Sequence, residues 1–517
     1  MSSRSRRAAI VVTLVLALAG GAVAGLILVR SGNATGIDLT SASLVPADAA
    51  AYVGLNSDLT SSQWVAAFDL VKRLGESDPE GQLKSAASSS GTDWNRDVAP
   101  FLGGDAGLYV RSLGTSTDDF QGAVIIRCQD ANRALNVLEQ QSGASFSGAS
   151  HDGMQYLTSD DGKVLLARLG DHVVAANDQQ SLFNVMDLKA GKGSALDTVA
   201  DFKALRDELA TNFLVFTYVS TQDLVKGLLG SDALAQTLTG NADFARPVAL
   251  ELGAKSGSFE LQSATVKGDG KVAPMMQPHT SRFAGLLPAE TSAFFSTNGI
   301  AQTWDQITPM LHRQLDDAIS QTGQYGSLDD ALQAAGQQIG LSSLTELINL
   351  FSGETAVAVT FPSGSDQPSF LVMAEVSDEQ HASDVLAQVA ASSGAAGSTT
   401  QAGKTTIRTF SDDSGNQLGY AVTDGYVAFG SLPLLTETIN QPDATLAQQP
   451  GYQNTVLAVP GGLGSYLYLD LAGLLQRFAG DSLPGDLSGL QAIQGLILNA
   501  VDLNGISRFS GVVAVGR

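Results

Sequence analysis

The residue types that most often carry chemistry are sparse and scattered in this sequence. Its histidines are His151, His172, His279, His312 and His381. None of them forms a His-x-x-x-His or His-Glu-x-x-His pattern, which would place two imidazoles on one helix face to bind zinc. We interpret each histidine as a structural residue and expect no metal site.

Nucleophile and phosphate-binding patterns are equally weak. The sequence has no Gly-x-Ser-x-Gly and no Ser-x-x-Lys motif. The stretch Gly191-Lys192-Gly193-Ser194 lacks the upstream glycine of a phosphate loop. Gly461-Gly462-Leu463-Gly464 precedes an expected strand, whereas a dinucleotide loop follows one. We therefore expect no catalytic residue, no cofactor and no enzymatic activity.

Two acidic turns offer oxygen ligands that calcium prefers. They are Asp160-Asp161-Gly162 and Asp412-Asp413-Ser414-Gly415-Asn416. Neither has the spacing of an EF-hand loop or its closing glutamate. Because Asp, Asn and Gly also favour tight turns, hairpin turns explain both stretches without a metal.

Length and charge narrow the class of protein. The 517 residues suffice for two to four domains. The formal net charge of −23 argues against binding to nucleic acid or to anionic lipid headgroups. The single cysteine, Cys128, lies in an apolar run and cannot form a disulfide within the chain.

The N-terminal residues have the pattern of a membrane anchor. Arg4, Arg6 and Arg7 precede an uncharged run over residues 8–29, which as a helix would be about 33 Å long and could cross a bilayer. The basic side of a span stays in the cytoplasm. We expect a cytoplasmic tail (1–7), a signal-anchor helix (8–29), a linker (30–43) and an extracytoplasmic C-terminal ectodomain.

A cleaved signal peptide is the alternative. Ala22-Val23-Ala24 fits a cleavage site, but the apolar run continues past it to Val29, which favours an uncleaved anchor. Gly21 stands where a lipoprotein would have its lipidated cysteine, so a lipoprotein is excluded.

The opening of the folded region occurs twice. Leu44-Val45-Pro46-Ala47-Asp48 leads into an apolar strand that ends at Asn56, and Leu286-Leu287-Pro288-Ala289-Glu290 leads into one that ends at Asn298. A tryptophan follows each strand within an expected helix. The opening returns after about 240 residues, and from Phe202 onward order and spacing persist at an offset of about 250 residues, which indicates an internal repeat. The modules are predicted over 44–270 and 280–517.

Each module alternates short strands with a few helices. Asp161-Gly162 and Gly170-Asp171 are hairpin-turn signals, and Asp130 is typical of a helix N-cap. Neighbouring strands that are joined by hairpins pair antiparallel. The predicted fold class is α+β, with two tandem repeats of a mainly antiparallel sheet that carries helices on one face.

These residues resemble a known family. The basic N-terminus with one anchor, the Leu-Val-Pro-Ala-Asp opening, the turn Phe101-Leu102-Gly103-Gly104-Asp105 and the Phe202-Lys203-Ala204-Leu205 helix resemble the bacterial domain-of-unknown-function family numbered 3352. The resemblance covers nearly everything after residue 40. It implies a bacterial cell-envelope location and a fold, and it implies no catalytic residues.

Two functions follow as hypotheses. The first is a non-catalytic envelope scaffold or protein-interaction module, since a tether raises the local concentration of the ectodomain near envelope partners. The alternative is a carrier or sensor that binds a lipid or another apolar ligand. An exposed apolar patch over a filled core would favour the first, and a continuous apolar cavity the second. The expected partners are the membrane, through the anchor, and an envelope protein or apolar ligand, but no nucleic acid.

The anchor prediction can be tested by truncation. Removal of residues 1–30 should yield a soluble, folded ectodomain, because the remaining chain has the composition of a globular protein. Far-UV circular dichroism and gel filtration without detergent measure this. An insoluble or unfolded product would contradict the boundary between tether and module.

Overall fold

The structure is a computed structural model of the chain. The residues that it describes are 39–89, 92–112, 120–209, 212–220, 246–267, 273–321, 324–362, 367–392, 397–412, 415–479, 485–503 and 505–516. Among the helices of these ranges, none is both long and apolar enough to span a bilayer. The predicted anchor over residues 8–29 lies outside the described residues.

The described strands form one antiparallel sheet of 20 strands. The strands of the first half are β1 (Ala51–Asn56), β2 (Asp105–Ser112), β3 (Gln121–Arg127), β4 (Phe146–His151), β5 (Met154–Ser159), β6 (Leu165–Leu169), β7 (His172–Ala176), β8 (Val215–Val219), β9 (Val248–Lys255) and β10 (Ser258–Val266). Those of the second half are β11 (Thr291–Asn298), β12 (Glu354–Thr360), β13 (Ser369–Glu375), β14 (Ser398–Ala402), β15 (Thr405–Ser411), β16 (Gln417–Thr423), β17 (Tyr426–Ser431), β18 (Ser465–Leu469), β19 (Ile493–Leu503) and β20 (Ile506–Val515).

The two halves share one strand order. From the outer edge inwards it is β4-β5-β6-β7-β3-β2-β1-β8-β9-β10 in the first half. The second half follows β14-β15-β16-β17-β13-β12-β11-β18-β19-β20. In each half, the first strand of the module, β1 or β11, lies inside the sheet and not at its edge.

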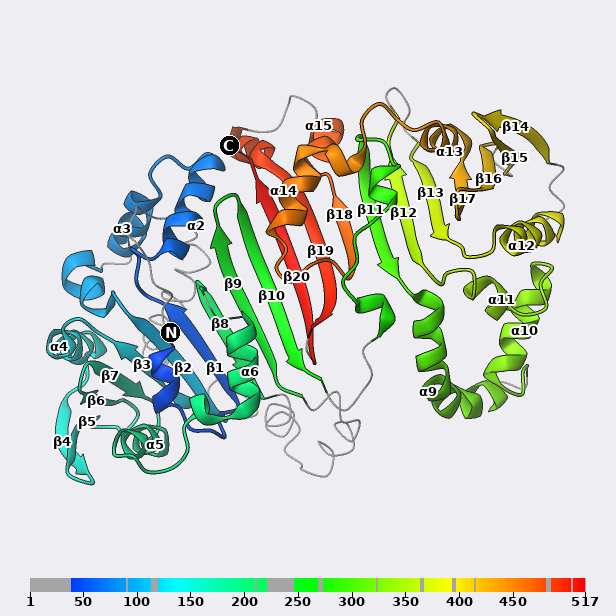
Figure 1. Cartoon of the computed structure of the whole chain (residues 1–517). Coiled ribbons are helices and arrows are strands. Elements are labelled where there is room, and N and C mark those ends of the chain that lie inside the picture. Colours follow the sequence, from blue (N-terminus) through cyan, green and yellow to red (C-terminus); the bar gives the residue numbers. More distant parts are fainter. Residues whose placement is uncertain are drawn as a thin grey trace.

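The halves meet where β10 pairs with β20. The pairing is antiparallel and runs from Ser258 opposite Ala514 to Val266 opposite Ile506. Leu261 lies opposite Gly511, its equivalent in the other half, so an approximate twofold axis passes through this pair. Figure 1 shows the resulting sheet as one surface that spans the molecule, with β10 and β20 at its centre.

Helices connect the strands in both halves. The α-helices are α2 (Ser62–Arg73), α3 (Pro79–Ser89), α4 (Ala131–Ser142), α5 (Gln179–Lys189), α6 (Ala200–Leu209), α9 (Ile300–Gln321), α10 (Leu328–Gln338), α11 (Leu344–Ile348), α12 (Glu379–Ser392), α13 (Leu432–Ile439), α14 (Pro450–Ala458) and α15 (Leu471–Ala479). The short helical turns are η1 (Thr40–Leu44), η2 (Trp94–Val98), η3 (Ala99–Phe101), η4 (Leu196–Thr198), η5 (Pro274–Met276), η6 (Phe283–Gly285), η7 (Leu446–Gln448) and η8 (Gly485–Ala492).

Helices cover both faces of the sheet, which corrects our expectation of one covered face. The face that carries Tyr52 and Ile125, here the A face, packs against α5 and α6, and its second half against α13 and α14. The opposite B face carries Val124 and Val173 and packs against α4. The uninterrupted apolar runs in β3 and β7 have this cause, since a strand buried on both sides cannot alternate with polar residues.

Aromatic side chains fill the A face of the first half. Phe202 on α6 contacts Tyr52, Phe216 and Tyr218 in edge-to-face geometry, with ring centroids 5.2–6.0 Å apart. All four side chains are buried. Such contacts add to the hydrophobic free energy of burial. The helix therefore fixes the central strands β1 and β8 to each other.

The repeated opening motif ties each module to a distant loop. Pro46 forms a β-bridge with Ala195, and Pro288 forms one with Thr445. Leu196 N–H donates to the carbonyl of Val45 at 2.7 Å, and Leu446 N–H to that of Leu287 at 2.9 Å. The conserved spacing of the motif thus serves the same long-range backbone contacts in both halves.

Several expected boundaries hold and some do not. The Asp130 side chain caps α4 by accepting from Arg133 N–H at 3.0 Å. The sequence prediction did not include β4, an edge strand rich in Ser and Gly, although Asp152-Gly153 beside it is a hairpin signal. Residues 39–43, which we assigned to the linker, are part of the fold, because Leu39, Ser41 and Ala42 are buried.

The central pairing predicts that the halves do not persist as separate monomers. A fragment that ends near residue 270 would expose β10, and a fragment from residue 273 would expose β20, and each unpaired edge is a template for association. We expect each half alone to aggregate or self-associate, and the two co-expressed halves to form a one-to-one complex. Gel filtration with light scattering measures this. A stable monomeric half would contradict it.

Candidate functional site

A buried carboxylate occupies the same position in both halves. Asp105 at the start of β2 accepts hydrogen bonds from the Thr40 hydroxyl and from Ser41 N–H, the latter at 2.7 Å. Glu354 at the start of β12 accepts them from the Ser281 hydroxyl and from Arg282 N–H, the latter at 2.7 Å. These carboxylates hold the chain segment before the first strand against the sheet, so we assign them a structural role.

The Glu354 carboxylate also ends a short polar chain. The Ser296 hydroxyl donates to it at 2.8 Å, and His279 Nε2 lies 2.9 Å from the same hydroxyl oxygen. The pKa of His279 is lowered by burial, so its ring is neutral near pH 7. A nucleophilic serine would have to donate its proton to the histidine. Here the proton points to Glu354, so this group is not arranged for nucleophilic attack.

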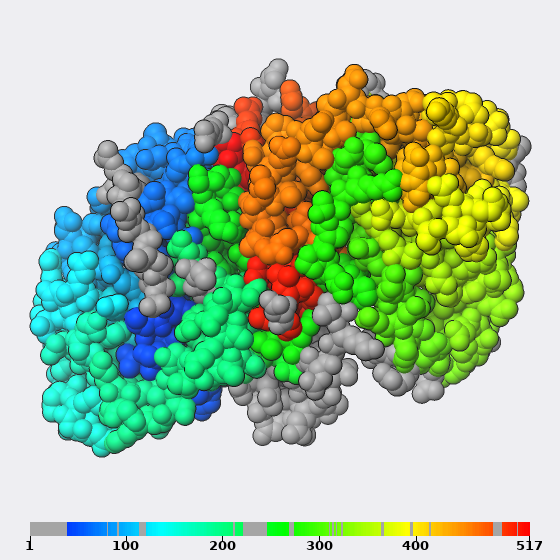
Figure 2. All heavy atoms as spheres, viewed as in Figure 1, coloured from blue at the N-terminus to red at the C-terminus, as the bar shows by residue number. Residues whose placement is uncertain are grey.

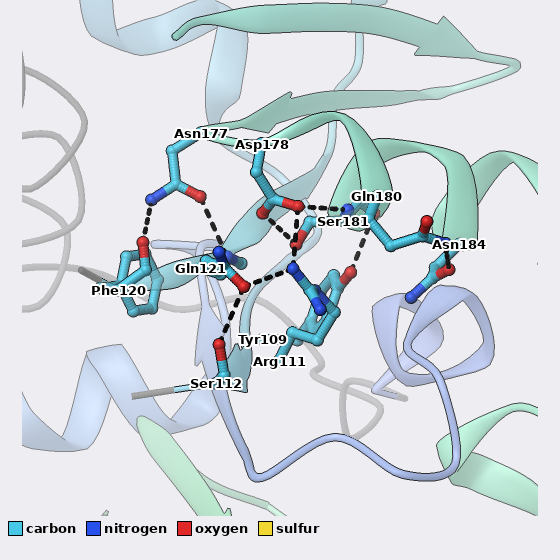
Figure 3. A network of polar contacts seen from close by, with 11 residues as sticks. Tyr109, Arg111, Ser112, Phe120, Gln121, Asn177, Asp178, Gln180, Ser181 and Asn184 are labelled. Atoms are coloured by element: carbon cyan, nitrogen blue, oxygen red, sulfur yellow. Dashed lines mark hydrogen bonds and ion pairs between the residues drawn. The ribbon is translucent and has the colours of Figure 1, made fainter. Parts of the chain in front are cut away.

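A second polar network joins β2, β3 and the start of α5 (Figure 3). Arg111 contacts the Gln121 side chain and lies 3.2 Å from Asp178, which caps α5 by accepting from Ser181 N–H. The Tyr109 hydroxyl donates to the carbonyl of Ser181 at 2.8 Å. Burial raises the pKa of Tyr109 to about 12, so it stays protonated and can only donate here. The network fixes α5 to the sheet.

The histidines His172, His381 and His312 lie in different parts of the fold. His172 begins β7, opposite Arg127, just as Tyr426 begins β17 opposite Glu375. His381 is exposed on α12. His312 lies 3.1 Å from Asp316 through one ring nitrogen and 3.5 Å from Asp329 through the other. The two ring nitrogens face different acids, so these three side chains do not converge.

The loops with possible ligands are built as turns. The carbonyl of Ser194 accepts from Ala47 N–H at 2.9 Å, which explains the glycine-rich stretch before it as a connection. The Asp161 carboxylate accepts from the Ser159 hydroxyl at 2.8 Å, and that of Asp412 from Asn416 N–H at 2.8 Å. Asp413 and Ser414 lie outside the described residues. The carboxylates of Asp161 and Asp412 therefore stabilise their own hairpins.

The junction of the two halves reverses the usual distribution of polarity. On its A face, between α6 and α14, polar side chains are nearly inaccessible to solvent; they are Glu251, Ser258, Glu260, Gln262, Asn499, Arg508 and Ser510, all at most 6% exposed. On its B face, the side chains of Leu250, Leu261 and Phe509 are 39%, 52% and 47% exposed. Buried polar groups and exposed large apolar side chains are the observations that most often mark function.

Ion pairs join the two halves on both faces of the sheet, because Arg508 lies on the A face and Asp502, opposite Ser507, lies on the B face. Arg508 on β20 contacts the Glu208 carboxylate on α6, and Lys267 after β10 contacts Asp502 on β19. Figure 2 shows residues of the C-terminal strands at the surface between α6 and α14. Each pair joins one half to the other. They compensate part of the cost of burying charge.

Glu251 has no such partner. One of its carboxylate oxygens, Oε2, is buried without a hydrogen bond within the described residues. Burial, and secondly the nearby Glu260, raise the pKa of Glu251 to about 8. Glu260 itself has Lys255 Nζ at 2.7 Å. Glu251 is therefore mainly protonated at neutral pH. As a result, the junction is buried without an unpaired charge on Glu251.

The apolar side chains of the B face form a continuous band. Residues directly opposite one another on nine neighbouring strands are all apolar or glycine; this apolar band consists of Leu252, Leu261, Gly511, Leu498, Leu467, Phe295, Val357, Val372 and Phe429. Every one of these residues is half-buried or exposed. At about 4.8 Å per strand, the band extends for roughly 40 Å.

The helices of the B face leave this band partly open. At one margin, α2 packs over the end of β9 and β10, where Trp64 and Phe68 bury Ala254 and Val515. Further along, α15 contacts β19 and β11. Beside the band, Leu250 and Phe509 flank Ser263 in the next row, so the most exposed large apolar side chains of the described strands lie at the junction.

Sequence patterns alone did not reveal the junction. Alternation in β10 does contain a signal, because Glu260 and Gln262 alternate with Phe259 and Leu261. This pattern would normally place the glutamate in water and the leucine in the core. The position of α6 over the polar side reverses that assignment. Only the pairing of β10 with β20 shows that the row continues into the second half.

Comparisons with known proteins place the chain in a family without a described activity. A family model described as "Protein of unknown function (DUF3352)" matches residues 9–508. Two crystal structures of TP0453 are 10% identical to the chain with a TM-score of 0.25. The match to crystal form III covers 44% of this chain and 80% of the TP0453 chain. The match to crystal form I covers 46% of this chain and 81% of the TP0453 chain. Likeness this low carries no argument about function. No curated protein matches the sequence.

The raised pKa of Glu251 predicts a pH dependence of stability. Between about pH 4.5 and 8 the folded protein retains a proton that the unfolded chain has lost, so stability falls as pH rises through this window. Glu251→Gln removes this effect. We expect the free energy of unfolding of the variant, relative to that of the wild type, to increase by roughly 1–3 kcal/mol when the pH is raised from 5 to 8.5.

Thermal or urea unfolding at both pH values measures the difference. Glu139→Gln, on the exposed surface of α4, is the control and should change stability equally at both pH values. A gain for Glu251→Gln that is the same at pH 5 and pH 8.5 would show that the carboxyl titrates normally.

Proposed function

Since this chain belongs to the DUF3352 family of proteins of unknown function, we propose that it is a membrane-anchored, extracytoplasmic, non-catalytic module that binds a partner protein of the cell envelope through its apolar band. The proposal of an anchor is supported by the basic residues that precede the uncharged run over residues 8–29. The observation that carries the binding function is the exposure of Leu250, Leu261 and Phe509 on the B face of the junction.

The size of the apolar surface supports a protein partner. The band and the adjoining apolar row from Phe259 to Phe370 are each about 7 Å wide, so together they cover roughly 40 Å by about 13 Å. This is an area of about 500 Å², at the upper end for the apolar patch of a monomer. A stable interface buries about 800 Å² on each partner. The apolar surface, together with the polar residues around it, approaches this area. An open sheet face also leaves one side of a bound acyl chain in water, whereas a protein surface would cover it.

Charge favours the same occupant. With a formal net charge of −23, the chain repels an anionic lipid surface and attracts a basic one. The band itself has no charged side chain, so it offers no partner for a lipid phosphate. We therefore assign the band to a protein that presents an apolar strip with a basic margin. Such a margin would accelerate association without determining the affinity.

The absence of a catalytic role is part of the proposal. In the described residues, the serine nearest to a histidine donates its proton to Glu354, and the tyrosine pKa values at Tyr109 and Tyr452 are raised by burial to about 12. The two tyrosines therefore stay protonated near neutral pH and do not act as bases there. Their arrangement supports packing and hydrogen bonding.

Photo-crosslinking in intact cells tests the function. A photoreactive phenylalanine analogue replaces Leu261 in the full-length protein, and the matched control replaces Leu457, which is 83% exposed on α14 and outside the band. We expect one dominant protein adduct at position 261 and none at 457. The adduct should fall at least about tenfold when Phe509→Glu is added, because a charge in the contact must be desolvated.

Each other outcome decides against the proposal. Equal adducts at both positions would show non-specific proximity. An adduct at position 261 with the mass of a lipid would replace the protein partner by an apolar ligand. A protein adduct that persists in the Phe509→Glu variant would place the contact away from the exposed apolar side chains of the junction.

A further inference from the structure

Three side chains that bind metals converge at the outer edge of the first half. His151 ends β4, Asp152 lies in the turn to β5, and Asp187 lies on α5. One ligand atom from each lies within 4.8 Å of the other two. We propose that His151, Asp152 and Asp187 bind a divalent transition-metal ion of the Zn²⁺ class. The site is separate from the apolar band and does not depend on it.

The distances suit a shared ion. His151 Nε2 lies 2.9 Å from Asp187 Oδ1 and 3.9 Å from Asp152 Oδ2. Zinc binds nitrogen and oxygen at about 2.0–2.2 Å, so two ligand atoms on one tetrahedral ion are about 3.4 Å apart. The two distances bracket this value. The ligand atoms of the two carboxylates lie within 4.8 Å of each other, so binding would require the carboxylates to turn towards a common ion.

The three ligands are held by the fold. The His151 ring stacks on Phe183 of α5, with centroids 3.8 Å apart and planes 10° from parallel. Asp152 has a positive φ of 49° and is followed by Gly153, so its backbone is fixed by a two-residue hairpin turn. Asp187 lies on a helix. A prearranged ligand set reduces the entropy lost on binding.

The second half offers an internal comparison. There the hairpin between β14 and β15 also approaches the helix α13, but it does so with Ala402 and Gly403, and a side chain on Gly403 would lie 3.6 Å from Asn440 Oδ1. The same contact between hairpin and helix is thus built without histidine or acid. Packing alone does not require His151, Asp152 and Asp187.

Lys192 competes for the same carboxylate. Its ammonium contacts Asp152 Oδ2, and the Lys192 backbone N–H donates to the carbonyl of Asp187 at 2.8 Å. The Lys192 side chain is 58% exposed and can turn away into solvent. Metal binding would replace the ammonium by a divalent ion.

The donor set defines the class of ion. One imidazole nitrogen and two carboxylate oxygens suit borderline ions such as Zn²⁺ or Co²⁺ better than Ca²⁺, which prefers six or more oxygens. Three protein ligands leave coordination positions open. In the anchored protein, such a site could clamp the edge hairpin to α5, which lie next to each other in Figure 1, and accept a further ligand.

Zinc titration of the full-length protein in detergent tests this site. After dialysis against a chelator, we expect calorimetry with ZnCl₂ to show one equivalent, and added Co²⁺ to give a visible absorption band of a low-symmetry site. His151→Gln and Asp187→Asn should each weaken binding at least about tenfold. Lys192→Met should strengthen it severalfold, because it removes the competing ammonium.

Matched controls separate the site from general binding to acidic residues. His312→Gln removes a histidine that also lies beside two aspartates without converging on one point, and it should leave the affinity unchanged. Circular dichroism verifies that each variant folds. Equal affinity of wild type and His151→Gln, or no gain from the exposed Lys192→Met, would overturn the proposal, as would the failure of the wild type to bind either ion.

Discussion

The antiparallel pairing of β10 with β20 is the interaction on which the rest of this structure depends. It joins two ten-stranded halves into one sheet and removes the edge that each would otherwise expose. The paired residues run the whole length of β10. Because opposite residues on paired strands share a face, this register also decides which side chains of the two halves become neighbours. The apolar band and the buried polar cluster are both consequences of it.

The junction shows how helices, and not strand patterns, decide which face is inside. Alternation along β10 and β20 separates polar from apolar residues correctly, but α6 and α14 lie over the polar side. Burial of that side is tolerated because Arg508 contacts Glu208, Glu260 has Lys255, and Glu251 keeps a proton. A buried polar cluster of this kind contributes less to stability than an apolar one would. It leaves the apolar side of the junction exposed to solvent.

The two halves preserve the frame and differ in the residues placed on it. Asp105 and Glu354 hold equivalent segments against the sheet, and Pro46 and Pro288 make equivalent bridges. These duplicated contacts serve folding. By contrast, the group formed by His151 and its acids is not repeated at the equivalent hairpin of the second half, which carries Ala402 and Gly403.

The sequence by itself determined the class of fold, the repeated opening and most strands, because hydrophobic periodicity and turn residues such as Asp161-Gly162 act over a few positions. Capping by Asp130 could be predicted for the same reason. The family resemblance also came from local motifs, and the family match agrees with it. Tertiary structure alone decided that helices cover both faces, that the sheets join, and that Leu261 and Phe509 face solvent. It also brought Asp187 to His151. These outcomes depend on contacts between residues far apart in the chain, and local periodicity carries no information about which distant segments meet.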